Sequence, residues 1–280
     1  MSIILTISIL IFLVCGAFAL LSYGFAWYEN ANREPQLLED RFAPDSLLLA
    51  ARLIVLESCA LFVTVLLHPF GWFSPKGLRT DHEGGLPVIL LHGLFQSRAC
   101  WLWTRFRLRQ FGYRNVYAIS LPPWKDIEHL SERVAAAVDE VSLDLGVEKV
   151  MLVGHSMGGI VARHYLQGRG GAPKVAACMF LATPHGGSKL VPFALSPLGK
   201  LVMPGSAYLQ VLGSEPLPAG VQLTAIHTRH ENIVLPWENA CLPGLEGIEM
   251  RGIGHTGLLF HPEVFDMLLR SLKGVGLGHS

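Results

Sequence analysis

The chain has 280 residues, of which 51% are hydrophobic and 16% charged, and its 22 Lys and Arg residues balance 22 Asp and Glu residues. The zero net charge argues against a nucleic-acid-binding protein, because such a protein needs surplus basic side chains to neutralise phosphates. The hydrophobic content excludes a disordered chain, since disorder requires low hydrophobicity and high net charge.

The charges are unevenly distributed along the chain and divide it into two parts. Residues 1–75 hold three of the basic and six of the acidic residues, whereas residues 76–280 have the composition of an ordinary globular domain. We therefore predict a membrane portion at residues 1–75 and one folded domain at residues 76–280, which is long enough to bury a core of its own.

The first apolar segment, from Ser2 to Tyr28, contains no charged side chain. It exceeds the roughly 20 residues that a helix needs to cross about 30 Å of hydrocarbon. A cleaved signal peptide is the alternative, but no Lys or Arg precedes the apolar run, and the run is longer than that of a signal peptide. We predict a retained transmembrane helix that ends in aromatic residues, which favour the membrane interface.

The second apolar segment, residues 46–73, carries Arg52 and Glu57. An ionisable group at the bilayer centre costs about 2.5–3.5 kcal/mol, so we place the span at residues 53–73, with Arg52 outside the hydrocarbon. Glu57 then lies one turn into the helix, and we interpret it as an interfacial residue. The alternative is a polar contact between Glu57 and the first helix.

Two spans form a hairpin that places the N-terminus and the folded domain on the same side of the membrane. The connecting segment has Arg33 and Arg41 and the exit has Lys76 and Arg79, so the positive-inside rule does not distinguish the sides. The five cysteines are scattered and form neither a disulfide framework nor a metal-binding group, which favours the reducing cytoplasmic side. The sequence predicts no oligomeric state.

The folded domain alternates short apolar runs with helical patterns. Continuous apolar runs are typical of strands buried on both faces of a parallel sheet, and they predict strands at 87–91, 115–119, 149–153, 175–181, 221–226 and 247–250. Between these runs, the helical patterns predict helices at 127–145, 159–166 and 262–272. The alternation predicts a mostly parallel, doubly wound α/β sheet, whose ligands bind beyond the carboxyl ends of the strands.

The third strand runs directly into Gly154-His155-Ser156-Met157-Gly158, and a helical pattern follows. This is the G-x-S-x-G motif in its required context of strand, sharp turn and helix. Glycine flanks the motif because a Cβ at either position would clash with neighbouring chain in so tight a turn. We predict that Ser156 is a nucleophile raised above the sheet. An ordinary strand-to-helix turn is the alternative, since glycine is frequent in this chain.

Acyl transfer also needs backbone N–H groups directed at the oxyanion that forms. One donor would be Met157, the residue after the nucleophile. The other should come from the loop after the first strand, where Gly93 lets the chain turn so that the N–H of Leu94 points inward. We interpret His92 as a support of this loop through hydrogen bonds rather than as an acid or a base.

A serine nucleophile requires a base, and His255 has the most suitable surroundings of the 12 histidines. It lies in a glycine-rich segment, residues 252–257, just before the last predicted helix, in the chain order Ser, acid, His. His261 is the second choice. The acid should follow the strand at 221–226, where Glu231 is the carboxylate in the turn and Glu238 is the alternative.

With these residues in place, the domain resembles the bacterial lipases of the α/β-hydrolase superfamily. The resemblance rests on residues 87–94, 150–159, 182–188 and 252–259, which occur in the family's order, and it extends over residues 86–273. It implies an α/β-hydrolase fold and a triad of Ser156, Glu231 and His255. It also implies backbone oxyanion donors at Leu94 and Met157 and no organic cofactor. The family's usual acid is Asp, so Glu231 departs from the pattern, as does the membrane hairpin.

These features predict a serine hydrolase, anchored in a bacterial inner membrane, that cleaves carboxylic esters of lipids through an acyl-enzyme. The apolar segment 189–213 is expected to form a small cap over the site, with irregular packing as the alternative. A thioesterase or acyltransferase would use the same triad, and a non-enzymatic scaffold with a hydrolase fold is a third possibility. We expect an ester substrate and the bilayer as partners, and neither a metal nor a nucleic acid.

Overall fold

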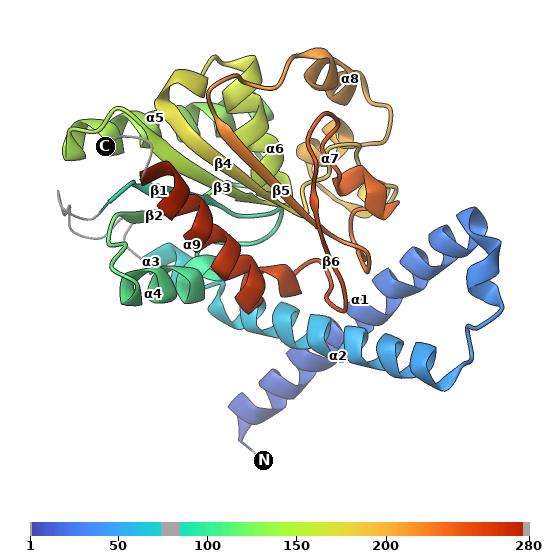
Figure 1. Ribbon diagram of the computed structural model, residues 1–280. Coiled ribbons are helices and arrows are strands. Elements are labelled where there is room, and N and C mark those ends of the chain that lie inside the picture. The colour runs from blue at the N-terminus through green and yellow to red at the C-terminus, as the bar shows by residue number, and fades with distance from the viewer. Residues whose placement is uncertain (1, 74–84, 277–280) are drawn as a thin grey trace.

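The computed structural model describes residues 2–73 and 85–276 (Figure 1). Its larger part is a six-stranded parallel sheet in the order β2-β1-β3-β4-β5-β6. The strands are β1 (Val88–Leu91), β2 (Val116–Ile119), β3 (Val150–His155), β4 (Val175–Leu181), β5 (Gln222–Thr228) and β6 (Ile248–Met250). Each coincides closely with a predicted apolar run, so the prediction of a parallel α/β sheet is confirmed.

The strand order places β1 beside β3 at the point where the chain changes direction across the sheet. Leu91 at the end of β1 pairs with Gly154 near the end of β3. The loops that follow these two strands therefore leave the sheet next to each other at its carboxyl edge. This is the position at which doubly wound sheets bind their ligands.

Helices cover both faces of the sheet and form two cores (Figure 1). On one face lie α5 (Ile127–Leu145) and α6 (Met157–Arg163), and on the other lie α4 (Leu102–Gln110) and α9 (Pro262–Gly276). Successive residues of β1 supply the two cores in turn, with Ile89 on the first face and Val88 and Leu90 on the second. This alternation explains why β1, β3 and β4 are buried along their whole length and are mostly apolar.

Short helices complete the folded domain. They are η2 (Arg98–Trp101), the π-helical turn η3 (His164–Gly168), η4 (Ala172–Lys174), η5 (Val191–Phe193), α7 (Pro197–Leu201), α8 (Ala207–Ser214), η6 (Trp237–Ala240) and η7 (Gly257–Phe260). The predicted helix at 159–166 begins two residues earlier, at Met157, because the serine turn leads directly into it.

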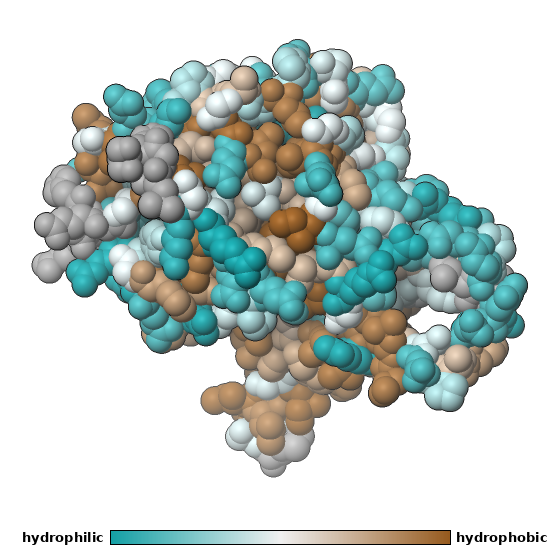
Figure 2. Space-filling view, viewed as in Figure 1, coloured by the Kyte–Doolittle hydropathy of each residue, from teal (hydrophilic) through white to brown (hydrophobic). Residues whose placement is uncertain are grey.

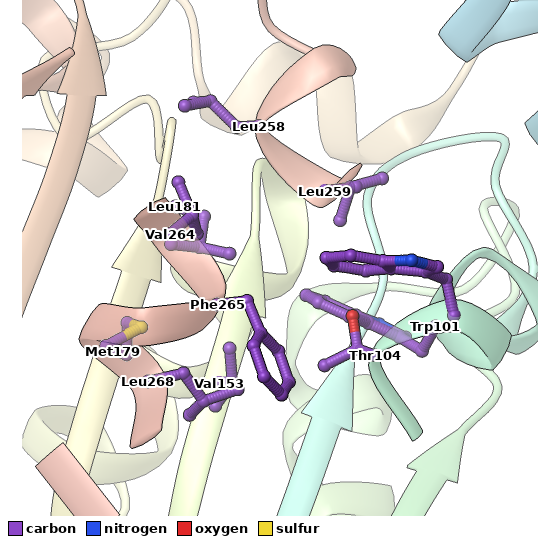
Figure 3. A pocket seen from close by; sticks show the side chains of 11 residues that line it. Trp101, Thr104, Val153, Met179, Leu181, Leu258, Leu259, Val264, Phe265 and Leu268 are labelled. Carbon is purple, nitrogen blue, oxygen red and sulfur yellow. The ribbon is translucent and has the colours of Figure 1, made fainter. Parts of the chain in front are cut away.

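A small cavity of about 10 Å³ lies in the core between the sheet and α9 (Figure 3). Its lining is almost entirely apolar and includes Trp101, Met179 and Phe265. A space of that size holds about one water molecule, and no residue of the expected triad borders it. The cavity is therefore a packing void rather than a substrate pocket.

The N-terminal part is a hairpin of two long helices, α1 (Ile3–Arg33) and α2 (Pro44–Leu67), joined by η1 (Pro35–Leu38) and followed by α3 (Phe70–Phe73). By length and composition, both α1 and α2 could cross a membrane. Their bounds differ from the prediction, since α1 continues past Tyr28 and α2 begins at Pro44. Proline suits this first helical position, because its missing N–H would have no helical partner there. The expected boundary between residues 75 and 76 lies outside the described residues.

The hairpin turns small and polar side chains inward and large apolar side chains outward. The buried residues are Cys15, Ala19, Ser22 and Ala26 in α1, and Leu53, Glu57, Ser58, Ala60 and Thr64 in α2. Among the exposed apolar residues are Ile4 at 78%, Leu13 at 61% and Leu48 at 70% exposure. Figure 2 shows apolar side chains around the projecting N-terminal end of α1. This pattern is the reverse of a water-soluble helix pair and favours contact of the outer faces with lipid.

The hairpin packs on the carboxyl edge of the sheet, next to the His255 loop, defined here as residues 251–257. Glu57 of α2 is 1% exposed, and its carboxylate accepts hydrogen bonds from the backbone N–H groups of Thr256 and Gly257. The interpretation of Glu57 as an interfacial residue is therefore wrong. The loop lies outside the sheet, so its buried N–H groups need an acceptor, and the side chain of α2 supplies it.

Candidate active site

Ser156 lies at the turn between β3 and α6 with φ 53° and ψ −123°, a conformation that residues with a Cβ rarely adopt. The turn has no space for side chains at its flanking glycines. A Cβ on Gly154 would lie 2.6 Å from backbone atoms of Gly159, and a Cβ on Gly158 would meet the backbone at Leu91. The strained serine thus persists because close packing on both sides fixes the turn.

The imidazole of His255 and the carboxylate of Glu231 form a buried pair. Nδ1 of His255 lies 2.9 Å from Oε1 of Glu231. Glu231 belongs to the turn after β5 and His255 to the loop after β6, so two adjacent parallel strands bring them together. The ring of His255 also packs against the ring of His155, with centroids 4.7 Å apart. Because His155 immediately precedes Ser156, this contact places His255 beside the serine turn.

The turn after β5 folds around the carboxylate of Glu231. Oε1 accepts hydrogen bonds from the backbone N–H groups of Asn232, Ile233 and Val234, at 3.0, 2.8 and 3.1 Å. These donors fix the oxygen that faces His255. The side chain of Glu231 therefore curls back over its own turn.

The surroundings of His255 act on its pKa in opposite directions. Burial is the largest single influence, and alone it would lower the pKa by favouring the neutral ring. The charge of Glu231, its close approach to the ring and the charge of Glu57 favour the imidazolium, and together they raise the pKa above its ordinary value of 6.5. A histidine in this setting can accept a proton and hold it beside Glu231, as a general base must.

Asn232 and His155 hold the backbone of His255 in place. Oδ1 of Asn232 accepts a hydrogen bond from the N–H of His255 at 3.1 Å, and Nδ2 donates to Oγ of Ser22 in α1 at 2.8 Å. Nε2 of His155 lies 3.2 Å from the carbonyl oxygen of His255. No sequence signal pointed to Ser22, because a serine in an apolar helix has no pattern that marks a contact so far along the chain.

The loop after β1 meets the serine turn at Gly93. A Cβ on Gly93 would lie only 3.0 Å from the Cβ of Ser156, so glycine permits this close approach. Phe95, with φ 58°, turns the loop back. Leu94 follows Gly93, and Met157 follows Ser156, so the two expected oxyanion donors belong to two segments that touch.

His92 joins the loop after β1 to the loop after β2. Its Nε2 accepts a hydrogen bond from the N–H of Leu121 at 2.9 Å, so Nδ1 carries the ring proton and donates to the carbonyl oxygen of Gly93, also at 2.9 Å. Burial lowers the pKa of His92 to about 4. The ring is therefore neutral near pH 7, and both of its nitrogens bind loop backbone.

The segment 189–213 forms the three short helices η5, α7 and α8. Val191 and Leu198 are buried in the same core as α5 and α6, so the segment is firmly packed. Four of its large apolar side chains remain exposed, and the most exposed are Leu195 at 93% and Phe193 at 70%. The ring of Phe193 stacks on Phe25 of α1, with centroids 5.6 Å apart. The segment thus continues the apolar outer surface of the hairpin.

Glu238 and His261, the alternatives for the acid and the base, lie elsewhere and have other partners than the His255–Glu231 pair. Oε2 of Glu238 is ion-paired with Arg33 of α1 at 2.6 Å. His261 lies at the start of α9, where its carbonyl oxygen accepts the N–H of Phe265. Within residues 2–73 and 85–276, no group of three or more His, Cys, Asp or Glu side chains could hold a metal ion.

The sheet is parallel and doubly wound, and its carboxyl edge carries a strained serine turn and a buried histidine–carboxylate pair. These features together are typical of the fold of serine hydrolases. Residues 88–238, more than half of the chain, match the model of the alpha/beta hydrolase family. The chain therefore belongs to the alpha/beta hydrolase family.

Solved structures of lipases share this fold. Mature lipase BlEst2 of Bacillus licheniformis superposes with a TM-score of 0.56 at 20% identity, over 71% of this chain and 96% of that chain. Lipase B of Aspergillus fumigatus gives a TM-score of 0.59 at 18% identity, over 71% of this chain and 55% of that chain. At such identities, the likeness shows the fold alone.

One curated protein is similar in sequence over part of the chain. It is the dihydrolipoyllysine-residue acetyltransferase component of the acetoin cleaving system of Pseudomonas putida, which is 34% identical over 124 residues. The match covers 41% of this chain and 30% of that protein. The chain thus matches less than a third of the length of this relative.

Proposed function

We propose that the protein is a membrane-anchored serine hydrolase that cleaves carboxylic esters, with Ser156 as nucleophile, His255 as base and Glu231 as acid. The observation that carries the proposal is the 2.9 Å approach of His255 Nδ1 to Glu231 Oε1, beside a serine of positive φ. A strained backbone of this kind costs about 1–3 kcal/mol, and burying a charged pair costs more. Features that lower stability in this way are typical of active sites, and family membership supports the proposal.

In the proposed reaction, His255 takes the hydroxyl proton of Ser156 as the serine oxygen attacks the ester carbonyl carbon. Glu231 holds the imidazole with its own proton on Nδ1 and stabilises the imidazolium that forms. His255 then gives the proton to the leaving alcohol, and an acyl-enzyme remains. A water molecule, deprotonated by His255 in the same way, attacks the acyl carbon. His255 then returns that proton to the oxygen of Ser156 as the acyl–serine bond breaks, which releases the carboxylic acid and restores the free enzyme.

The backbone N–H groups of Leu94 and Met157 are the proposed oxyanion donors. Removing one such donor from an enzyme of this type costs about 2.7–4 kcal/mol of transition-state stabilisation. Gly93 supports the proposal by letting the two donor segments approach. His92, through its two hydrogen bonds to loop backbone, would keep the donor of Leu94 in position.

We propose a lipid ester as the substrate, such as an acylglycerol or a phospholipid. The outer faces of α1 and α2 are apolar, and Phe193 of the segment 189–213 stacks on Phe25 of α1. The hairpin would anchor the enzyme in a membrane, with the folded domain on the cytoplasmic side, and the segment would act as a cap beside which an acyl chain enters.

Acyl transfer is the second candidate, since one relative is named as an acetyltransferase component. The same triad would form an acyl-enzyme from an ester or thioester and pass the acyl group to an acceptor other than water. Mass spectrometry of the products distinguishes the two reactions. A free carboxylic acid as the product indicates hydrolysis, and an acylated acceptor indicates transfer.

A fluorophosphonate probe, which reacts with activated serines, tests the proposed nucleophile. We expect the detergent-purified wild type to be labelled and to hydrolyse p-nitrophenyl butyrate, and Ser156→Ala to lose both properties while remaining folded. Absence of label and of hydrolysis in folded wild type would contradict the proposal and favour a non-enzymatic scaffold. Retained activity in Ser156→Ala would exclude this nucleophile.

A further inference from the structure

A carboxylate of the N-terminal hairpin holds the His255 loop. Oε1 of Glu57 accepts a hydrogen bond from the N–H of Thr256 at 2.8 Å, and Oε2 accepts one from the N–H of Gly257 at 3.1 Å. Glu57 lies near the middle of α2 and is 1% exposed. Its two donors directly follow His255, so both oxygens of one side chain fix the loop at this point.

Both hairpin helices reach the backbone around His255. A Cβ on Gly254 would clash with side chains of α1 and of α2, so the hairpin approaches the loop as closely as glycine allows. From the other side, Asn232 connects the N–H of His255 to Ser22 of α1. The position of His255 therefore depends on α1 through Asn232 and on α2 through Glu57.

The titratable groups near His255 come from several elements. They are Glu231 after β5, His155 of β3, Glu57 of α2 and Tyr23 of α1, whose hydroxyl borders Gly254. The two carboxylates both favour the imidazolium form of His255. Removing the charge of Glu57 alone would leave the triad residues unchanged and still alter the protonation equilibrium of the base.

Attachment of the hairpin does not by itself require a buried carboxylate. Ion pairs at the surface, Arg33 with Glu238 and Arg229 with Glu34, already join α1 to the folded domain. Enclosing a carboxylate is unfavourable unless hydrogen bonds compensate it, and here the compensating bonds come from the loop that carries the proposed base.

We propose that Glu57 is a positioning residue of the active site, which fixes the loop at Thr256 and Gly257 and thereby places the imidazole of His255. The proposal rests on the proposed role of His255 as the base. It makes the hairpin a part of the active site, because the base is correctly placed only when α2 is docked on the loop.

Variants of the full chain in detergent test the proposal. Glu57→Gln keeps the size of the side chain and removes its charge, whereas Glu57→Ala removes both acceptors. Glu57→Asp keeps the charge on a shorter side chain. The matched control is Glu34→Gln, which removes another carboxylate that joins the hairpin to the folded domain but pairs with Arg229 instead of the loop. Thermal unfolding confirms that each variant is folded.

We expect kcat of Glu57→Gln for p-nitrophenyl butyrate to fall about tenfold without a change in KM, because the loop loses a hydrogen bond. The acidic limb of its pH profile should move about one pH unit lower, since the charge that favours the imidazolium is gone.

Glu57→Ala should lose about 100-fold in kcat, because a displacement of about 1 Å can cost that much. Glu57→Asp should retain the wild-type limb, and Glu34→Gln should match the wild type. If folded Glu57→Gln had the same acidic limb of the pH profile as the wild type, the proposal would be overturned. Glu57 would then serve only to attach the hairpin to the folded domain.

NMR titration of the His255 imidazole separates this proposal from the proposed function, because it needs no substrate. A lower pKa of His255 in Glu57→Gln than in the wild type supports the positioning role even if the wild type hydrolyses no ester. Equal pKa values overturn it. Failure of the wild type to react with the fluorophosphonate probe overturns the proposed function alone.

Discussion

Oε1 of Glu231 lies 2.9 Å from Nδ1 of His255 and accepts the backbone N–H groups of the three residues that follow Glu231. One oxygen thus fixes the turn after β5 and orients the imidazole. A substitution of this side chain should therefore affect the base and the turn together.

Glu231→Gln should lower kcat by about 10³- to 10⁴-fold, because a neutral side chain neither selects the required tautomer nor stabilises the imidazolium. Hydrolysis of p-nitrophenyl butyrate measures the loss. Glu238→Gln is the matched control, since Glu238 pairs with Arg33 at the surface, and its activity should stay within about twofold of the wild type. The reverse ranking of the two variants would assign the acid to Glu238.

The pH dependence should follow the protonation of His255. Burial alone would lower the pKa, but Glu231 and Glu57 together raise it above 6.5. Only the neutral ring accepts a proton from Ser156, so kcat/KM should be highest above this pKa and decline as the pH falls through it. Initial rates across a pH series measure the midpoint. A midpoint below 6.5 would contradict the geometry of the pair.

Gly154→Ala should destabilise the fold by about 1–3 kcal/mol, because the added Cβ meets backbone that has no space to move. Denaturant unfolding in detergent measures the change. Gly213→Ala in α8 is the control, since a Cβ there meets nothing within 4 Å, and it should stabilise by about 0.5–1 kcal/mol. Equal effects of the two variants would mean that the serine turn is not tightly packed.

His92→Ala should reduce both the stability of the fold and kcat without moving the acidic limb of the pH–rate profile. It leaves the N–H of Leu121 and the carbonyl oxygen of Gly93 without their partner, at a cost of about 1–3 kcal/mol for each buried group. The limb should stay in place because the pKa of His92, at about 4, lies below the working range. A shifted limb would instead give His92 a part in proton transfer.

Phe193→Ser combined with Leu195→Ser should lower hydrolysis of triacylglycerol in phospholipid vesicles at least several-fold. A large apolar side chain gains about 1.5–3 kcal/mol when it is buried, and these two extend the apolar surface of the hairpin. Hydrolysis of soluble p-nitrophenyl butyrate should be unchanged. Leu143→Ser, at an exposed position of α5, is the control and should change neither rate. Equal losses on both substrates would argue against a role in lipid contact.

The sheet and the serine turn could be predicted from the sequence because their causes are local. The strands β1, β3 and β4 are buried along their whole length and are therefore mostly apolar, and the turn at Ser156 requires its glycines whatever surrounds it. Helix α4 was not predicted, since Arg105, Arg107 and Arg109 alternate with apolar residues and imitate the period of a strand.

The contacts between hairpin and active site could not be predicted because they join segments that no local pattern relates. Glu57 and its partners Thr256 and Gly257 are 199 and 200 residues apart. The composition of α2 predicts only an apolar helix, and the carboxylate of Glu57 in such a helix is expected at a membrane interface. In the structure, Glu57 is buried instead, because the His255 loop of the folded domain needs its carboxylate as a hydrogen-bond acceptor.

The place of Glu57 along α2 also limits how the hairpin can lie in a bilayer. A helix that stood upright across the membrane would carry its midpoint, and with it the His255 loop, into the centre of the hydrocarbon, where backbone groups without partners cost several kcal/mol each. In the docked arrangement, α2 instead runs beneath the sheet's carboxyl edge, and only the outward sides of the two helices remain for lipid (Figure 1). If the protein keeps that docking in a membrane, these outward sides form the lipid-facing surface of the hairpin, and the His255 loop lies directly behind α2.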